Sequence, residues 1–244
     1  MNAYELIMET VLRKRFIRVL HVMWFATYAA IFLIPFPPEM WNWGIFMFGW
    51  SGCLLPLLLS AGIFGDDVAS GRISLLVTKP IRMRDFYFYR LLGLSLQDAV
   101  HLVLLAGLIL GLFHLTHRGN VAHFEAWLLA SWLVFNTWAA LSTSLSVVVK
   151  REHNAMLLFF GAAVTYAIIS SLSYFYPDSR ATALIHNVVR WSCPPVELMA
   201  SLAMAKHTLV RSLADVGHSL VLTACYGAIG IVLLGKREYK RAGD

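Results

Sequence analysis

Long apolar runs separated by short polar breaks dominate the sequence. Six runs of about 18 to 28 residues lie at approximately 19–36, 41–64, 86–113, 124–149, 155–175 and 216–234. A helix needs about 20 apolar residues to cross the hydrocarbon core of a bilayer, so the pattern predicts six transmembrane helices. Prolines at 35, 37 and 38 end the first run, and Trp41 and Trp43 begin the second at the depth where tryptophan is favoured.

Residues 1–12 have an amphipathic pattern. Apolar side chains at helical spacing oppose Asn2, Glu5 and Glu9. The apolar positions are Tyr4, Ile7, Met8, Val11 and Leu12, and the basic residues that follow are Arg13, Lys14, Arg15 and Arg18. This pattern predicts an interfacial helix leading into the first span, and it fits a cleaved signal peptide poorly.

Residues 177–215 are mixed, with apolar segments broken by Pro194 and Pro195. The segment is too apolar for a solvated loop, so we expect short helices on, or dipping into, the outer leaflet. No internal repeat divides the chain, and we predict one all-α membrane domain over 1–244.

Composition agrees with membrane integration. The chain of 244 residues is 59% hydrophobic and 14% charged, with a mean hydropathy of +0.66, whereas a soluble domain has about a quarter of its residues charged. The net charge of +6 does not indicate nucleic acid, because the positive residues cluster at the ends of apolar runs. Cys53, Cys193 and Cys225 form no disulfide framework.

The distribution of basic residues predicts the topology. Placing both termini in the cytoplasm puts 15 of the 20 Lys and Arg residues on that side. The positive-inside rule therefore favours a multi-pass protein of the inner or plasma membrane with both ends inside. The polar break at 64–90 is then cytoplasmic, and 177–215 faces outward.

The break at 64–90 has the pattern of a short docking helix. Its acidic pair suits a helix N-terminus, and its proline, which has no N–H, suits the end. The acidic pair is Asp66 and Asp67, the apolar positions are Val68, Leu75 and Leu76, the middle is Gly71 and Arg72, and the end is Lys79 and Pro80.

Several polar or small residues lie inside the runs. Asp98 and His101, one turn apart, either line a pathway as a proton-linked pair or form an interhelical hydrogen bond, and we favour packing. Asn136 belongs to a polar stripe that either faces a conduit or bonds its own helix. Gly107 and Gly111 form a GxxxG face for a dimer seam or for a contact within the bundle.

Two motifs that suggest bound ligands do not meet their chemical requirements. His114, His117 and His123 with Glu125 match no zinc spacing, so we expect no metal site. Residues 230–237 nearly match a phosphate-binding loop, but Arg237 replaces the hydroxyl that holds Mg²⁺, and the run is aliphatic. No hydrolase or zinc-protease motif is present, and we expect no catalytic residue.

The break at 64–90 resembles the cytoplasmic loop of ABC-2 type transporter permeases. That family has an acidic start, a glycine, a Leu-Leu pair, and then proline and a basic residue before the third span, which here are Asp66 and Asp67, Gly71, Leu75 and Leu76, and Pro80 with Arg82. The order of interfacial helix, six spans and outer segment is also similar, and the length resembles small exporter permeases such as the haem-exporter B subunit. The family often has Glu-Arg at 66–67 and Gly-Thr at 71–72, so the subfamily stays open.

The resemblance implies a coupling helix over 66–82 that docks in a groove on a separate ATPase subunit. It further implies two ATPase copies, a second permease copy or a homologous permease, and ATP with Mg²⁺ on the partner, none of it bound by this chain. The resemblance also implies that the complex is an exporter, but the sequence does not indicate its substrate. Two other classes stay open: an intramembrane enzyme that uses Asp98, His101 or the outer histidines, and a membrane scaffold or sensor that transports nothing.

Overall fold

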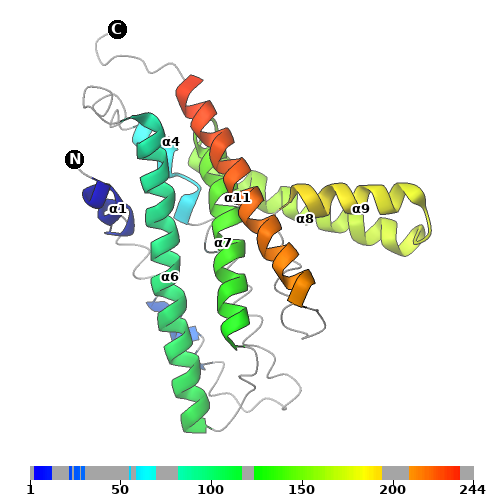
Figure 1. Ribbon diagram of the computed structural model, residues 1–244, viewed down its shortest axis with the longest axis horizontal. Helices are drawn as coiled ribbons and strands as arrows, with labels where there is room; N and C mark the ends of the chain where they lie inside the picture. Colours follow the sequence, from blue (N-terminus) through cyan, green and yellow to red (C-terminus); the bar gives the residue numbers. More distant parts are fainter. Residues whose placement is uncertain are drawn as a thin grey trace.

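The computed structural model describes residues 3–12, 22–23, 25–27, 29–30, 55, 59–69, 82–116, 124–193 and 209–236. All regular elements within these ranges are α-helices (Figure 1). They are α1 (Ala3–Leu12), α4 (Ile63–Ala69), α6 (Met83–Thr116), α7 (Phe124–Ser146), α8 (Arg151–Phe175), α9 (Arg180–Ser192) and α11 (Leu209–Lys236).

Four of these helices, α6, α7, α8 and α11, are long and apolar enough to cross a membrane. They coincide with the last four predicted runs, which confirms the prediction of a helical, multi-pass membrane protein at this level. The first two predicted spans lie mostly outside the described residues, so the number of six spans stays a prediction. The proposed sides of the membrane also stay predictions.

Helix α7 is the centre of the bundle, with α6 on one side and α11 on the other (Figure 1). Within a bilayer the lipid competes for apolar surface, so hydrogen bonds between helices become useful. The hydroxyl of Thr137 lies 2.9 Å from the hydroxyl of Ser219 and 3.0 Å from that of Thr223. Thr137, which the predicted polar stripe on this run does not include, therefore helps to hold α7 against α11.

Helix α1 confirms the helix predicted over 1–12, but its buried face differs from the predicted one. Leu6 and Thr10, one turn apart, are buried, and α1 packs against α6. Tyr4, expected on the apolar face, is 69% exposed. At Gly93 of α6 an added Cβ would lie 2.7 Å from the Thr10 Cβ, so a glycine is needed for the two helices to approach this closely.

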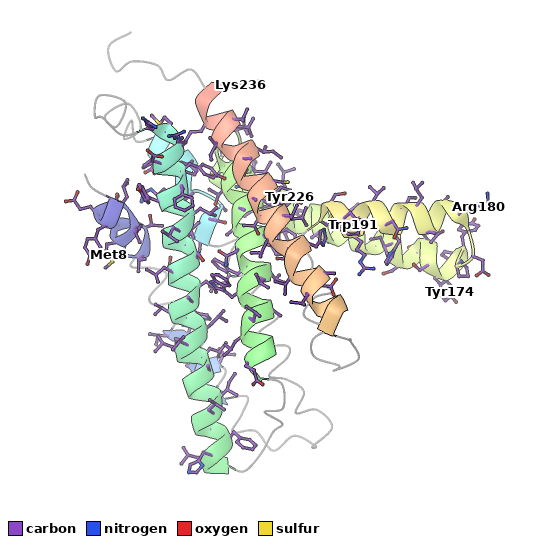
Figure 2. The ribbon with its side chains drawn as sticks, viewed as in Figure 1. Met8, Tyr174, Arg180, Trp191, Tyr226 and Lys236 are labelled. Atoms are coloured by element: carbon purple, nitrogen blue, oxygen red, sulfur yellow. The ribbon has the colours of Figure 1, made fainter. Side chains whose placement is uncertain are left out.

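Helices α8 and α9 form a hairpin that extends sideways from the bundle (Figure 1). Figure 2 places Tyr174 and Arg180 at its far end and Trp191 nearer the bundle. Helix α9 is one of the short helices predicted in 177–215, and Ser179 caps it by accepting a hydrogen bond from the N–H of Ala181. Its other end is tied to α11 by Arg190, whose guanidinium lies 3.6 Å from the Asp215 carboxylate.

The hairpin leaves a large apolar surface uncovered by the described chain. Only 6% of the most apolar stretch of α8 is buried, against 67% for α7. Phe159 and Phe160 are more than half exposed. A surface of this kind is suited to lipid rather than water.

Gly230 of α11 can be used to test the close packing of α11 against α6. A Cβ at this position would lie 2.2 Å from the hydroxyl oxygen of Tyr87, whose ring is buried and stacked. Because the ring cannot move away cheaply, we expect Gly230→Ala to lower the free energy of unfolding in detergent by about 1–3 kcal/mol. Gly217→Ala on the same helix is the control, since its Cβ meets nothing within 4 Å, and it should be neutral or stabilising by up to about 1 kcal/mol. Equal effects of the two substitutions would contradict the close packing.

Candidate functional site

The short helix α4 holds the first part of the predicted docking segment. It contains Asp66, Asp67 and Val68, but it begins at Ile63, so the acidic pair does not lie at its N-terminus as predicted. The position of Asp67 has a different cause, namely its buried contact with Arg90 of α6. Residues 70–81 of the predicted segment lie outside the described residues, and among them are Gly71, Arg72, Leu75, Leu76, Lys79 and Pro80.

Arg82, the last residue of the predicted segment, is described and exposed. Its carbonyl accepts hydrogen bonds from the N–H groups of Asp85 and Phe86, at 3.0 and 3.1 Å. It therefore opens the first turn of α6, which puts the end of the segment directly at the base of that helix.

Arg90 of α6 is the centre of a buried ionic cluster, which we call the Arg90 cluster: Arg90, Asp67, Glu9 and Thr10. The Arg90 side chain is fully buried, as is that of Asp67, and 3.2 Å separates their charged atoms. The same guanidinium nitrogen lies 3.2 Å from a Glu9 carboxylate oxygen, and the other terminal nitrogen donates to the Thr10 hydroxyl at 2.9 Å. Three segments, α1, α4 and α6, thus meet at one guanidinium.

The cluster has the geometry that a buried charge requires. A guanidinium removed from water is tolerated when carboxylates and additional acceptors surround it. The ring of Phe86, 5.2 Å from the Arg90 carbon Cζ, adds a cation–π contact on the remaining side. Losing one partner would leave an uncompensated charge inside the protein, so the three segments are strongly coupled.

An aromatic contact continues from α4 into the bundle. Phe64 stacks on Tyr87 with ring centroids 5.0 Å apart and planes within 3°. The Tyr87 hydroxyl lies 2.9 Å from the Ser144 hydroxyl of α7, and Ser144 also bonds the carbonyl of Tyr226 in α11. Buried groups in direct contact therefore link α4 to α6, α7 and α11.

Asn154, in the first turn of α8, connects the same region to the hairpin. Its buried side-chain amide donates to the carbonyls of Ala61, just before α4, and of Ser142 in α7, at 2.9 and 2.8 Å. Helix α4 with the turn before it is accordingly in contact with α6, α7 and α8, and it is linked to α1 through Arg90 and to α11 through Ser144. We call this set of contacts the α4 hub: the Arg90 cluster together with Phe64, Tyr87, Ser144 and Asn154.

Sequence reasoning missed most of the α4 hub. Arg90 was counted only as a topology signal, although an arginine inside a predicted span requires an acidic partner. Asn154 begins the fifth run after a very short turn, and an amide at such a place is a signal for backbone capping. Tyr87 carried no signal, because nothing in its own surroundings separates a packing tyrosine from an interfacial one.

Asp98 and His101 are both buried in α6, on the same face. Neither carboxylate oxygen of Asp98 has a hydrogen-bond partner among the described residues. The predicted interhelical hydrogen bond is therefore not formed by Asp98 there. The His101 ring stacks on Phe25, from the first predicted span, with centroids 5.2 Å apart. Asn136 is half-buried and donates to the carbonyl of Trp132 in its own helix, at 2.7 Å.

The remaining predicted sites are not assembled within the described part of the chain. Gly107 and Gly111 are exposed, and a Cβ at either would meet nothing within 4 Å, so this face is open rather than packed in the bundle. His114 and Glu125 are exposed, while His117 and His123 lie outside the described residues. Of the residues that are described, no three from His, Cys, Asp and Glu gather as metal ligands. Residues 230–236 are helical, as expected of a span and unlike a phosphate-binding loop.

Comparison with protein-family models finds no match, and comparison with curated proteins finds none. The α4 hub consists of groups that hold helices together. Asp67 and Glu9 contact the Arg90 guanidinium, and the Tyr87 hydroxyl and the Asn154 amide bond another hydroxyl or backbone carbonyls. These contacts join the start of a polar segment to the apolar helices around it.

Removing Arg90 tests the cluster. Arg90→Met leaves the buried Asp67 carboxylate without its cation, and we expect a loss of about 3–5 kcal/mol in the free energy of unfolding in detergent. Adding Asp67→Asn to Arg90→Met removes that buried charge and should recover part of the loss. The control is Asp85→Asn, which disrupts the exposed pair with Arg84 and should change stability by less than about 0.5 kcal/mol. If the double variant is as unstable as the sum of the single variants, the two residues are not coupled.

Proposed function

We propose that the chain is the membrane subunit of an ATP-driven transporter of the ABC-2 type, acting as an exporter permease. The observation that carries the proposal is the α4 hub. The polar segment between two apolar runs begins in a helix whose Asp67 is buried against Arg90 of α6. A segment that only rested on the membrane surface would not need a buried ionic anchor.

The proposed mechanism uses the stiffness of these contacts. Packed interiors resist compression and transmit strain, so a partner that moves residues 66–82 also moves the base of α6 and α1. The contact of Tyr87 with Ser144 carries the displacement to α7 and α11. In the proposal two copies of the ATPase subunit grip two permease chains, and closure of the ATPase pair changes how the helices pack.

ATP and Mg²⁺ belong to the partner in this proposal. The stretch 230–236 that resembles a phosphate loop is helical, and Gly230 lies against Tyr87 instead of a ligand. In the proposal both termini are cytoplasmic, in the inner or plasma membrane, α8 is a span, and the segment 177–215 with α9 is on the outer side. The other two classes make different predictions: a scaffold or sensor binds a partner without ATPase activity, and an intramembrane enzyme needs no partner.

The identity of the partner can be established by crosslinking in cells. A photo-crosslinking amino acid at position 75 of the full chain should capture a protein with a phosphate-binding loop. The same amino acid at position 184, an exposed position on α9, serves as the control and should not capture it. If the amino acid at position 75 instead captures a protein that has no nucleotide-binding residues, this result would support the scaffold class and overturn the transporter proposal.

Coupling is then measured on the complex of both subunits in lipid nanodiscs. Changing Leu75 and Leu76 to Asp puts two charges on the apolar ridge of the proposed helix, so we expect stimulated ATP hydrolysis to fall by about tenfold or more, since tenfold corresponds to 1.4 kcal/mol of docking energy. Changing the same residues to Met keeps the ridge apolar and should retain most of the stimulation. Undiminished hydrolysis in the Asp variant, with the complex intact, would sink the coupling role of residues 66–82.

A further inference from the structure

Two aspartates among the described residues have fully buried side chains but opposite surroundings. Asp67 is paired with the Arg90 guanidinium at 3.2 Å. Asp98, with 0% exposure, has no hydrogen-bond partner for either oxygen among the described residues. The same functional group is thus held at two sites, one with a cation and one without.

Asp98 lies close to the midpoint of α6. It is the sixteenth of the 34 residues of the helix, which places it about 22 Å along the axis from Met83 at 1.5 Å per residue. If α6 crosses the bilayer, this position lies within its apolar part, about two turns beyond Arg90. Ionisable residues at such depth are costly and mark functional sites by default.

The surroundings of Asp98 on its own helix are apolar. Leu94, Leu102 and Leu105 share its face at helical spacing and are buried. The titratable neighbour on this face is His101, one turn away, whose ring stacks on Phe25.

The neighbouring elements bring no cation to Asp98 among the described residues. On α7 the charged residue is Glu125, exposed near its N-terminal end. On α11 the basic residues are Arg211, near its N-terminal end, and Lys236, its last residue, while the His218 ring contacts the Trp191 carbonyl and Asp215 is engaged with Arg190 of α9. On α1 the charged residues are Glu5 and Glu9, and Glu9 is engaged with Arg90. A carboxylate at Asp98 would therefore be a buried, uncompensated negative charge.

We propose that Asp98 is a proton-binding site, a carboxylic acid that keeps its proton at neutral pH while α6 has this position. A neutral acid costs far less to bury than a carboxylate without donors. The proton would be released when α6 moves so that water or a donor reaches the carboxyl group. Asp98 lies eight residues from Arg90 on the same helix, about 12 Å along its axis. If α6 moves as one rigid helix, a displacement of Arg90 in the α4 hub therefore also displaces Asp98.

The inference does not rest on the proposed function, because it concerns the protonation of one side chain in the isolated chain. It is tested with dicyclohexylcarbodiimide, an apolar reagent that reacts with protonated carboxyl groups. The carboxyl proton moves to a carbodiimide nitrogen, the oxygen bonds to the central carbon, and the acyl group then shifts to nitrogen. The whole reagent stays on the side chain, so peptide mass spectrometry locates it.

We expect full-length protein in membranes at neutral pH to carry the adduct on Asp98, with an occupancy about tenfold or more above that on Asp67, because reaction at Asp67 would have to break its buried contact with Arg90. Asp67 is the matched control, since it is the same residue at the same burial. Asp98→Asn should lack the adduct. The infrared band of a protonated carboxyl group should also be present in the native chain and lost in Asp98→Asn, which decides the case if the reagent cannot reach the site.

His101→Phe separates a neutral acid from an ion pair. The variant keeps an aromatic ring next to Phe25 but removes the titratable nitrogens. If Asp98 is a neutral acid that does not depend on His101, its labelling should change by less than about twofold in this variant. An adduct that forms only in His101→Phe would mean that Asp98 is the ionised partner of an imidazolium, and this would overturn the proposal. Equal labelling of Asp67 and Asp98, or the absence of both adduct and infrared band, would overturn it as well.

Discussion

The burial of the Arg90 guanidinium is the constraint on which the arrangement of the cytoplasmic end, as proposed, depends. An arginine cannot shed its charge, so a folded state that removes it from water must bring anions to it. Those anions come from 23 and 81 residues away in the sequence, at Asp67 and Glu9. The ends of α1 and α4 are therefore not free to lie wherever the membrane surface allows. The length of the Arg90 side chain and the directions of its guanidinium N–H groups determine where these helix ends lie.

This constraint explains how a helix as short as α4 persists. Seven residues cannot form a stable helix alone, because nucleation costs more than so few hydrogen bonds return. Its stability has to come from tertiary contacts, and Phe64, Asp67 and the preceding turn provide them through stacking, an ion pair and the Asn154 amide. The polar break is thus anchored at its start by three different kinds of interaction. Any partner that binds the segment further along would act on a fixed point of the bundle.

The sequence predicts the helices well and their contacts poorly. Run length and amphipathic spacing are local properties, so α1, α6, α7, α8 and α11 are all recognisable from the chain itself. Contacts between distant residues leave no such local trace. The predicted apolar face of α1 includes Tyr4, but Arg90 selects the adjacent face with Thr10. Gly230 stood out for its likeness to a phosphate loop, whereas its actual constraint is the ring of Tyr87. The sequence pattern does not predict the sideways direction of the α8–α9 hairpin either, because an exposed apolar helix and a packed one can have the same composition.

Three positions along helix α6 have different surroundings. Near its start a charge is compensated by Asp67. Among the described residues, Asp98 at its midpoint has no hydrogen-bond partner, and Gly107 and Gly111 near its end have no close neighbour. A helix fixed only by apolar contacts could slide or rotate in small steps, because such contacts are not directional. The ion pair at Arg90 allows no gradual change, since separating the charges inside the protein is costly. In the proposed mechanism, movement of α6 would therefore be a switch between distinct positions, and the Asp98 carboxyl group two turns beyond the ion pair would pass from apolar surroundings to polar ones in the same step.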